Sequence, residues 1–404
     1  MPSCRDDSAA PVVTGIGVAT AFGYGKAALV DGLREPRPVF GELQRPGRQV
    51  PGRAAPFRGA ELAAPPERLP PRVARVTGFG GRVAVAVLAE AWEEAGLDDL
   101  APERIGLVIG GSNLDAREQM LTREAYAERM QYLLPSYGYT CFDTDLGGLC
   151  SSHFPIRGFA YTLGGASASG ALAVLHAADA VRSGRVDACI ALGALQDLSR
   201  YELQALAALG ALSPGESCRP FDSAHDGFMF GESCAALVIR RPAAGGKAYG
   251  RILGGAHLAN GNRGPEPSLA GEARAILAAL AQAGLPPEAI DYVNTHGTGT
   301  PKGDETELAA LRAAGVVDAA INATKSLIGH GLSAAGAVET AAVLLQMREG
   351  FLHPSLGLDD PIDDGFDWVR GAARPHRCRC ALKLSFGFGG IDSALVIGAV
   401  EEGA

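Results

Sequence analysis

The chain has 404 residues, of which 47% are hydrophobic and 20% charged, which excludes disorder for most of its length. This length exceeds that of a usual single domain and favours two fused halves or one large layered α/β unit. The formal net charge of −9 at pH 7 argues against nucleic acid or an anionic membrane as the partner.

No targeting segment is predicted at the start of the chain. Residues 1–10 contain Arg5, Asp6 and Asp7 and no apolar core, so they do not resemble a secretory signal. The uncharged stretch 158–178 is long enough to suggest a membrane span, but it is interrupted by glycines and serines. A buried strand, a turn and a helix fit this composition better. We therefore expect a cytoplasmic protein.

In the first half of the chain, apolar runs that stop at glycine predict buried strands, and alanine-rich runs predict helices. Nine prolines lie between residues 36 and 71. They exclude a regular helix or a central strand, so this segment should wrap the surface. The predicted strands are 12–18, 104–111 and 186–192, and the predicted helices are 83–95 and 171–183.

The second half repeats this alternation of helices and strands. Alternation of this kind predicts mainly parallel or mixed sheets that are covered by helices on both faces. We place the boundary between the halves in the segment 240–247, which gives an N-terminal half of residues 1–243 and a C-terminal half of residues 244–404. The predicted helices are 272–283, 306–314 and 334–347, with a strand at 290–295 and a hairpin-like strand pair within 382–400.

One histidine lies at the end of a predicted strand, in a segment rich in glycine and threonine. The sequence there reads Asn294-Thr295-His296-Gly297-Thr298-Gly299-Thr300. Such a constrained turn would display the imidazole as a catalytic group, whereas the alternative is a structural histidine in a glycine loop. For a lone histidine the structural alternative is favoured.

Two further motifs change this balance. Lys325 and His330 lie five residues apart around a glycine, directly before a predicted helix of small residues. Taken alone, they could be a solvated lysine and a helix-capping histidine. Near the C-terminus the chain reads Ser385-Phe386-Gly387-Phe388-Gly389-Gly390. Three such motifs in one chain argue against chance.

With these motifs the chain resembles the β-ketoacyl synthase (ketosynthase) family of fatty-acid and polyketide synthesis. The resemblance runs from Val12 to Val400 and includes Arg219-Pro220-Phe221-Asp222, Asp226-Gly227-Phe228 and Gly231-Glu232. It implies a thiolase-like α/β fold with five layers, αβαβα, built from two similar halves. It also implies a homodimer, as is usual for this family.

One departure from the family pattern concerns the nucleophile. The family carries a cysteine in a segment commonly written T-A-C-(A/S)-S-G, where this chain reads Gly164-Gly165-Ala166-Ser167-Ala168-Ser169-Gly170. No cysteine lies between residues 151 and 188. A free thiol has a pKa of about 8.5, whereas a serine hydroxyl needs a strong adjacent base to attack a thioester. Ser167 is thus either a weak nucleophile or a small residue that packs well.

The resemblance also assigns roles to the remaining motif residues. His296, Lys325 and His330 match the other catalytic positions of the family. The backbone N–H groups of Ser167 and Phe388 would form an oxyanion hole, and the Phe388 side chain would be a gate, unless it is only a core aromatic. In the family, the two histidines promote decarboxylation of a malonyl thioester by stabilising the enolate that forms.

Three functions therefore compete. The first is a malonyl-carrier-protein decarboxylase that makes acetyl-carrier protein, as in the serine-for-cysteine ketosynthases of polyketide β-branching cassettes, which supply a hydroxymethylglutaryl-synthase-like partner. The second is an acyltransferase or condensing ketosynthase that uses Ser167 as its nucleophile. The third is a non-catalytic subunit similar to a chain-length factor. Retention of His296, Lys325 and His330 argues against the third, so we expect the decarboxylase.

The predicted substrate is malonyl on the phosphopantetheine arm of an acyl carrier protein, with no other cofactor bound. An acidic carrier needs a local basic surface on a protein of negative net charge. Arg68, Arg72 and Arg75 are candidates, although each could be a solvated loop arginine. Cys378 and Cys380 have no matching second pair, so no metal site is expected. His225, Leu384 and Asp392 depart from the family pattern and put local loop hydrogen bonds in doubt.

Overall fold

The computed structural model describes residues 10–243 and 246–400. Each half of the chain contributes one mixed sheet, and the two sheets join where β1 (Val12–Thr20) pairs with β10 (Gly250–Ala259). From this junction the first sheet continues through β9 (Cys234–Arg240), β7 (Ala188–Gly193), β5 (Ile105–Gly110) and β6 (Phe159–Leu163). The second continues through β17 (Ile391–Gly398), β16 (Cys380–Gly387), β11 (Tyr292–Asn294), β12 (Ala320–Asn322) and β14 (Asp367–Trp368).

The two sheets repeat one pattern of strand pairing. Outward from β1, the pairs β1–β9 and β9–β7 are antiparallel, whereas β7–β5 and β5–β6 are parallel. Outward from β10, the pairs β10–β17 and β17–β16 are antiparallel, whereas β16–β11 and β11–β12 are parallel. The expected similarity of the two halves is therefore visible in the order and the direction of their strands.

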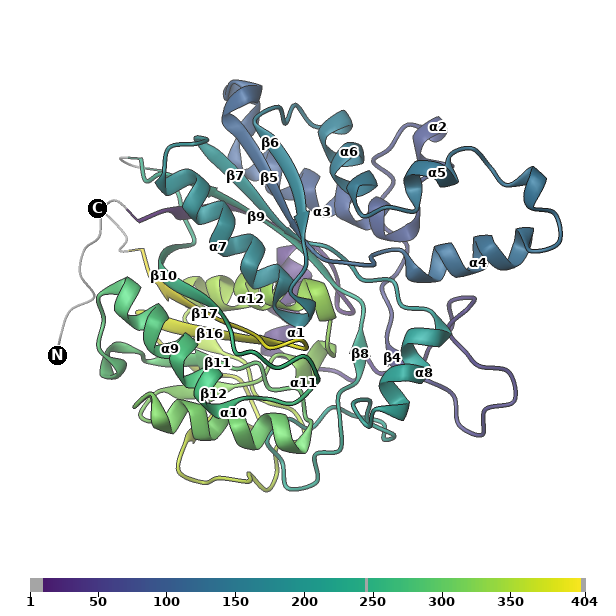
Figure 1. Cartoon of the computed structure of the whole chain (residues 1–404). Helices are drawn as coiled ribbons and strands as arrows, with labels where there is room; N and C mark the ends of the chain where they lie inside the picture. The colour runs from purple at the N-terminus through teal and green to yellow at the C-terminus, as the bar shows by residue number, and fades with distance from the viewer. Residues whose placement is uncertain (1–9, 244–245, 401–404) are drawn as a thin grey trace.

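Helices enclose and separate the two sheets, which gives five layers (Figure 1). The helices α7 (Ser169–Arg182) and α12 (Ala335–Glu349) lie between the sheets and contact both of them. The outer face of the first sheet is covered by α3 (Phe79–Ala95), and that of the second by α9 (Leu269–Ala283), against which α10 (Pro301–Ala313) packs. The predicted αβαβα architecture is confirmed.

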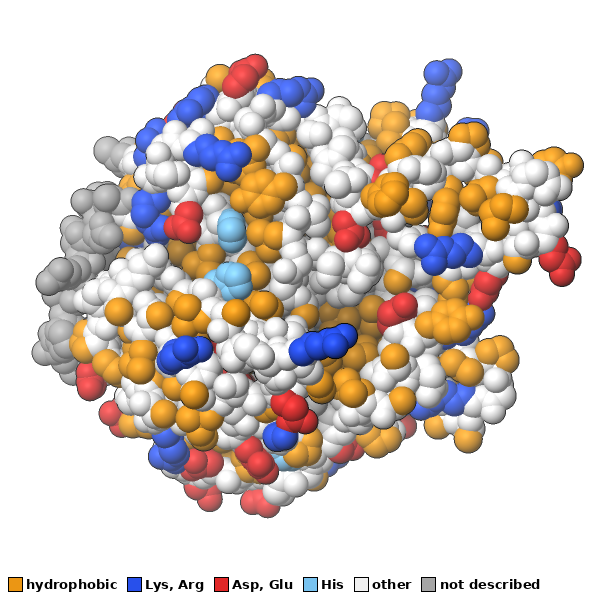
Figure 2. All heavy atoms as spheres, in the orientation of Figure 1, with side chains coloured by type: hydrophobic (Ala, Val, Ile, Leu, Met, Phe, Trp, Pro, Cys, Tyr) orange, Lys and Arg blue, Asp and Glu red, His pale blue; other side chains and the backbone are white. Residues whose placement is uncertain are grey.

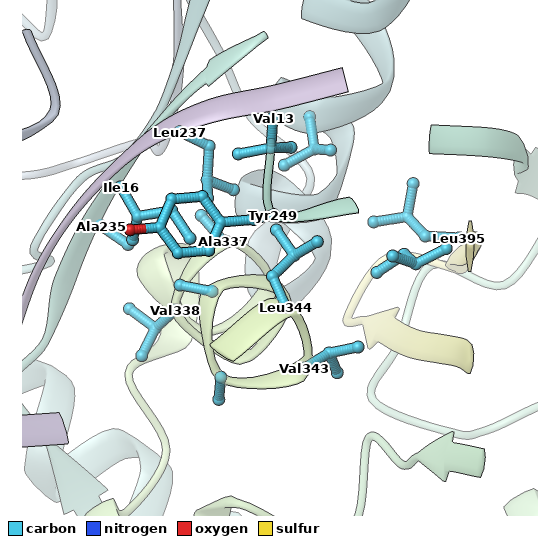
Figure 3. Close-up of a cluster of buried hydrophobic side chains, with 14 of the residues drawn as sticks. Val13, Ile16, Ala235, Leu237, Tyr249, Ala337, Val338, Val343, Leu344 and Leu395 are labelled. Atoms are coloured by element: carbon cyan, nitrogen blue, oxygen red, sulfur yellow. The ribbon is translucent and has the colours of Figure 1, made fainter. Parts of the chain in front are cut away.

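Apolar side chains of the central helices form the largest core cluster. Figure 3 shows Val338 and Leu344 of α12 beside Ile16 of β1 and Leu237 of β9, all of them buried. The two central helices also approach each other closely, because a Cβ atom on Gly336 would lie 2.3 Å from the backbone nitrogen of Ala171. This close contact brings the residues that precede α7 near those that precede α12.

Most predicted elements form close to their predicted bounds, and the differences have physical reasons. The helix predicted at 306–314 begins earlier, at Pro301, because proline is compatible with the first turn of a helix. Residues 158–178 form a strand, a turn and a helix as predicted, but β6 is only partly buried because it is the edge strand of its sheet. No helix of the described residues is long and apolar enough to cross a membrane.

The proline-rich segment 36–71 contains only two short strands and runs largely along the surface. It also sends one charged side chain into the interior, which the sequence did not predict. Arg48 is fully buried, and its guanidinium lies 2.8 Å from Asp197 and 2.5 Å from Glu232. These ion pairs anchor the segment, since a buried arginine needs such partners.

The predicted boundary between residues 243 and 244 stays a prediction, because residues 244–245 lie outside the described part of the chain. The remaining strands are β2 (Gly23–Tyr24), β3 (Gly41–Glu42), β4 (Arg58–Ala60), β8 (Phe230–Gly231), β13 (Phe351–Leu352) and β15 (Arg374–Pro375). The remaining α-helices are α1 (Lys26–Arg34), α2 (Pro71–Ala74), α4 (Ala116–Tyr126), α5 (Tyr137–Thr140), α6 (Thr144–His153), α8 (Arg200–Ala208) and α11 (Lys325–Ile328).

Candidate active site

Ser167 lies in a single turn of 3-10 helix that leads from the edge strand β6 into α7. The preceding residue, Ala166, has φ 47, a left-handed conformation that is uncommon for a residue with a side chain. The Ser169 hydroxyl holds this turn, because it accepts the Gly165 N–H at 2.9 Å and donates to the Ala166 carbonyl at 2.7 Å. Ser167 therefore sits half-buried at the positive end of a long helix, where negative charge is stabilised.

His330 lies between α11 and α12 and is almost completely buried. The backbone N–H of His330 donates to the Met229 carbonyl at 2.7 Å, and the backbone carbonyl of His330 accepts the Gly231 N–H at 3.1 Å. Gly329 before it has φ 77, and a Cβ atom there would lie 2.9 Å from the Met229 oxygen. Only glycine fits this position without strain, and the chain can then turn the His330 ring toward Ser167.

Ser167 and His330 are in direct contact, with 2.8 Å between Oγ and Nε2. The other ring nitrogen of His330, Nδ1, accepts the backbone N–H of Leu332 at 3.2 Å. In a neutral imidazole one nitrogen accepts and the other carries the proton, so the Leu332 contact assigns the proton to Nε2. Nε2–H is therefore the donor and Ser167 Oγ the acceptor of their hydrogen bond.

His296 follows β11, and its backbone is held from both sides by charged groups. Its N–H donates to Glu307 Oε1 at 2.6 Å, and the Gly297 N–H donates to Oε2 of the same carboxylate at 2.8 Å. Its carbonyl accepts from Lys325 Nζ at 2.5 Å. The His296 ring meets that of His330 edge-on, with 5.5 Å between the centroids. The two predicted histidines thus form one unit.

Lys325 belongs to a buried group of charges behind the histidines. Its Nζ lies 2.5 Å from Oε1 of Glu339, and Oε2 of that carboxylate lies 2.6 Å from Nζ of Lys383. All three side chains are buried. Within the described part of the chain, Lys325 makes no hydrogen bond to either imidazole ring. It holds the His296 backbone carbonyl instead, so its position suits an orienting role.

Both histidines are expected to be neutral at physiological pH. Burial lowers the pKa of His330 well below its ordinary value, and the cations Lys325 and Lys383 lower it further. Burial is also the main cause that lowers the pKa of His296 well below its ordinary value, followed by Lys325, His330 and Lys383. Each ring can therefore offer one N–H donor and one lone pair, rather than two donors.

The departures from the family pattern at residues 225 and 392 are accommodated by local hydrogen bonds. His225 Nδ1 lies 3.0 Å from Asp304 Oδ2, and Asp304 also accepts the backbone N–H groups of Phe221 at 2.6 Å and Gly299 at 3.1 Å. The loop that carries His296 is therefore tied to α10 through Asp304. Asp392 accepts from Asn260 Nδ2 at 3.0 Å, and Leu384 is buried in the core.

The predicted gate, Phe388, lies in the turn between β16 and β17, and 44% of its side chain is exposed. It is therefore not a core aromatic, which was the alternative. The neighbouring Gly387 lies against the Ser167 turn, because a Cβ atom on Gly387 would be 2.4 Å from the Gly165 oxygen. Whether the N–H groups of Ser167 and Phe388 form an oxyanion hole stays a prediction.

The three candidate docking arginines lie in and around the short helix α2, and all three are exposed. Arg68 Nη1 lies 3.5 Å from Glu93, which partly offsets its charge. The described residues contain no group of three or more His, Cys, Asp or Glu side chains arranged to hold a metal ion.

Three charged residues of the site were not assigned a role from the sequence. They are Glu307, Glu339 and Lys383. The available signal was a single lysine within the apolar run Ala381-Leu382-Lys383-Leu384, since a charge in a buried strand needs a partner.

Comparison with known proteins agrees with this arrangement. Residues 10–244 match the family model "Beta-ketoacyl synthase, N-terminal domain", and residues 249–359 match "Beta-ketoacyl synthase, C-terminal domain". The solved structure of a beta-ketoacyl synthase from Burkholderia phymatum STM815 superposes with a TM-score of 0.86 at 26% identity, over 97% of this chain and 100% of that chain.

Two named relatives match over nearly their full lengths. The polyketide biosynthesis malonyl-ACP decarboxylase PksF of Bacillus subtilis (strain 168) is 50% identical, over 97% of this chain and 97% of that protein. The tetracenomycin polyketide synthase ketoacyl synthase alpha subunit of Streptomyces glaucescens is 31% identical, again over 97% of each. Sequence models, relatives and architecture thus agree, and the chain belongs to the β-ketoacyl synthase family.

Proposed function

We propose that this protein decarboxylates malonyl-acyl carrier protein to acetyl-acyl carrier protein in polyketide biosynthesis, and that it supplies acetyl units for β-branching. One observation carries the proposal: His330 directs its Nε2–H toward the position that a catalytic nucleophile would occupy. The 50% identity to a malonyl-ACP decarboxylase supports the same reaction.

The reaction needs donors where negative charge develops. When the bond between the malonyl carboxylate and C2 breaks, carbon dioxide leaves and the electron pair moves toward the thioester oxygen, which forms an enolate. Neutral N–H donors on His330 and His296 can stabilise this oxygen, and preorganised donors of this kind are effective because they need not reorganise. The enolate then takes up one proton from solvent at C2 and becomes the acetyl thioester.

Ser167 is not required as a covalent catalyst in this scheme. A general base must accept the proton of the hydroxyl, but His330 Nε2 already carries a proton and donates a hydrogen bond to Oγ. The same contact could be mistaken for a serine–histidine catalytic pair if the Leu332 hydrogen bond were ignored. The acyltransferase and the condensing ketosynthase remain alternatives for the test below.

The acyl carrier protein is the proposed partner, and Arg68, Arg72 and Arg75 are the proposed contact residues. Two features support this surface: the three arginines are exposed on and beside α2, and together they form a local group of positive charge on a protein of net charge −9. The substrate would reach the histidines on the phosphopantetheine arm of the carrier, and no other cofactor is invoked. We also propose that the protein acts in the cytoplasm and that a hydroxymethylglutaryl-synthase-like enzyme of the pathway uses its product.

We further propose a homodimer. Two features support it: β6 is an edge strand of its sheet, and large apolar side chains are exposed on the lobe between α4 and α6. Figure 2 shows hydrophobic side chains gathered on this lobe, which projects from the body of the molecule in Figure 1. Sedimentation velocity would separate a dimer from a monomer. The exposed large hydrophobic residues of the lobe are Met130, Tyr132, Leu134, Tyr139 and Phe142.

Intact-protein mass spectrometry of malonyl-carrier protein, with and without the enzyme, tests the proposed reaction. Conversion to acetyl-carrier protein with no acyl group on the enzyme is the expected result. An acyl adduct on Ser167 would select the transferase instead, and an unchanged substrate would favour the non-catalytic subunit.

A further inference from the structure

Lys383 is a buried cation inside an apolar strand. It lies on β16 between Leu382 and Leu384, and its side chain is completely buried. Its Nζ lies 2.6 Å from Glu339 Oε2, and it donates to the Leu384 carbonyl at 2.6 Å and to Ser385 Oγ at 2.5 Å. A buried ammonium is tolerated only with such partners, and a hydrophobic side chain of similar volume would often be at least as stable. Stability alone therefore does not explain a lysine here.

Its partners connect it to the candidate active site. Glu339 binds Lys383 with one carboxylate oxygen and Lys325 with the other, and Lys325 holds the His296 carbonyl. On the other side, Ser385 begins the segment that leads to Gly387, which lies against the Ser167 turn. One chain of charged contacts thus joins the loop of His296 to the loop of Phe388.

We propose that Lys383 is a positioning residue for decarboxylation. It holds Glu339 and Lys325 behind His296, and it fixes the loop that bears Phe388. This inference rests on the proposed function. Lys383 does not touch the reacting atoms, so it acts through His296 and the loop rather than as a catalytic residue.

The surrounding charges give this role a signature in pH dependence. Burial, assisted by the charge of Lys325, lowers the pKa of Lys383 to about 8, although Glu339 of α12 and Glu307 of α10 oppose the shift. The cation also contributes to the lowered pKa of both His296 and His330. Its removal should therefore raise both histidine pKa values, and its deprotonation above pH 8 should weaken the network.

The test compares Lys383→Met with Lys26→Met as a matched control. Lys26 is also a lysine with carboxylate and carbonyl partners, and its side chain is 23% exposed. Its Nζ lies 2.9 Å from Glu90, 3.2 Å from Glu94 and 2.9 Å from the Ile16 oxygen. Its partners lie on α3 and β1 rather than at the histidines. Any effect of simply removing a paired lysine should appear in both variants.

The measurements are kcat and KM on malonyl-carrier protein across pH 6–9, and NMR titration of the histidine ring carbons. We expect Lys383→Met to lower kcat by about tenfold or more with little change in KM, because positioning acts in the transition state. We also expect wild type and Lys26→Met to lose activity above about pH 8 and Lys383→Met to lack this decline, since methionine at position 383 has no charge to lose. The histidine pKa values should rise only in Lys383→Met.

The outcomes separate the two proposals. A wild-type enzyme that does not decarboxylate malonyl-carrier protein overturns the proposed function, and the histidine titration then judges the role of Lys383 by itself. Equal kcat, pH profile and histidine pKa values in the two variants overturn the inference. If Lys383→Met does not fold, Ser385→Ala decides, because it removes only the bond to the loop: a lower kcat supports the inference and an unchanged kcat overturns it.

Discussion

Replacement of Ser167 by alanine should keep the decarboxylase activity within about an order of magnitude of the wild-type activity. The change removes one hydrogen bond, the contact between Oγ and His330 Nε2 at 2.8 Å, and keeps the backbone N–H of residue 167. Because Nε2 is the donor, its proton becomes free to bind the substrate oxygen. The serine hydroxyl competes for this donor and does not activate it.

The magnitude follows from the kind of bond that is lost. A hydrogen bond between neutral groups contributes about 0.5–1.5 kcal/mol, which corresponds to a change of about two- to thirteenfold in rate. Loss of an oxyanion donor costs about 10²–10³ in rate, so His330→Ala and His296→Ala should be far less active than Ser167→Ala. The double histidine variant should lose less than the product of the two effects, because the rings act as one unit.

The assay follows formation of acetyl-carrier protein by intact-protein mass spectrometry under single-turnover conditions. Each variant is first shown to be folded by circular dichroism and thermal unfolding, since Ser167 lies in a strained turn and His330 is buried. A folded Ser167→Ala protein that is as inactive as His330→Ala would refute the tautomer argument. The nucleophilic transferase would then be the better account.

Ser167→Cys should become acylated by acyl thioesters, because a thiol ionises near pH 8.5; an unmodified thiol under conditions that acylate an ordinary ketosynthase would contradict the placement of residue 167 at the nucleophile position. Lys325→Ala should have a kcat between those of Ser167→Ala and His330→Ala, since Lys325 holds the His296 backbone; a wild-type kcat would contradict this role. Arg72→Glu combined with Arg75→Glu should raise KM for the carrier-bound substrate, more so at low salt, and leave kcat unchanged; a KM that does not respond would exclude this docking surface. Burial raises the pKa of Glu272 to about 9, so the folded state holds a proton that the unfolded state loses above pH 4.5, and the free energy of unfolding should fall as pH rises toward 9. Glu272→Gln should make this dependence smaller, because it removes the contribution of Glu272, and urea unfolding at pH 6 and pH 8.5 can measure the difference.

The fold was predictable because its elements carry local signals. The strand β1 was predicted from its apolar run, although it continues past Gly15 and Gly17, which lie against the backbone of α3. The helix α3 stops at Gly96, which has φ 60, and the apolar residues of α7 lie in the core. The exposure of β6 was not predictable in this way. It depends on which strand lies at the edge of the sheet, and strand order is a property of the whole chain.

The site was predictable only in part, and for a similar reason. Motif resemblance identified His296, His330 and Ser167, and the structure joins them in one chain of contacts. The proton on His330 Nε2 could not be predicted, because it depends on a backbone N–H two residues away. The pairing of Lys383 with Glu339 could not be predicted either, since it depends on how β16 and α12 are placed against each other in the fold.

These contacts explain how a ketosynthase site can lose its nucleophile and still support a reaction. Condensation needs both a nucleophile that accepts the acyl group and donors that stabilise an oxyanion, whereas decarboxylation needs only the donors. The donors in this protein are set by the Leu332 N–H, by Glu307 and by Lys325, none of which depends on the residue at position 167. In the proposed mechanism a serine there accepts a hydrogen bond from His330 and keeps its own proton, so we expect no acylation at Ser167 while the histidine donors serve the substrate. The proposed reaction therefore uses the oxyanion donors of a ketosynthase site and does not need its nucleophile.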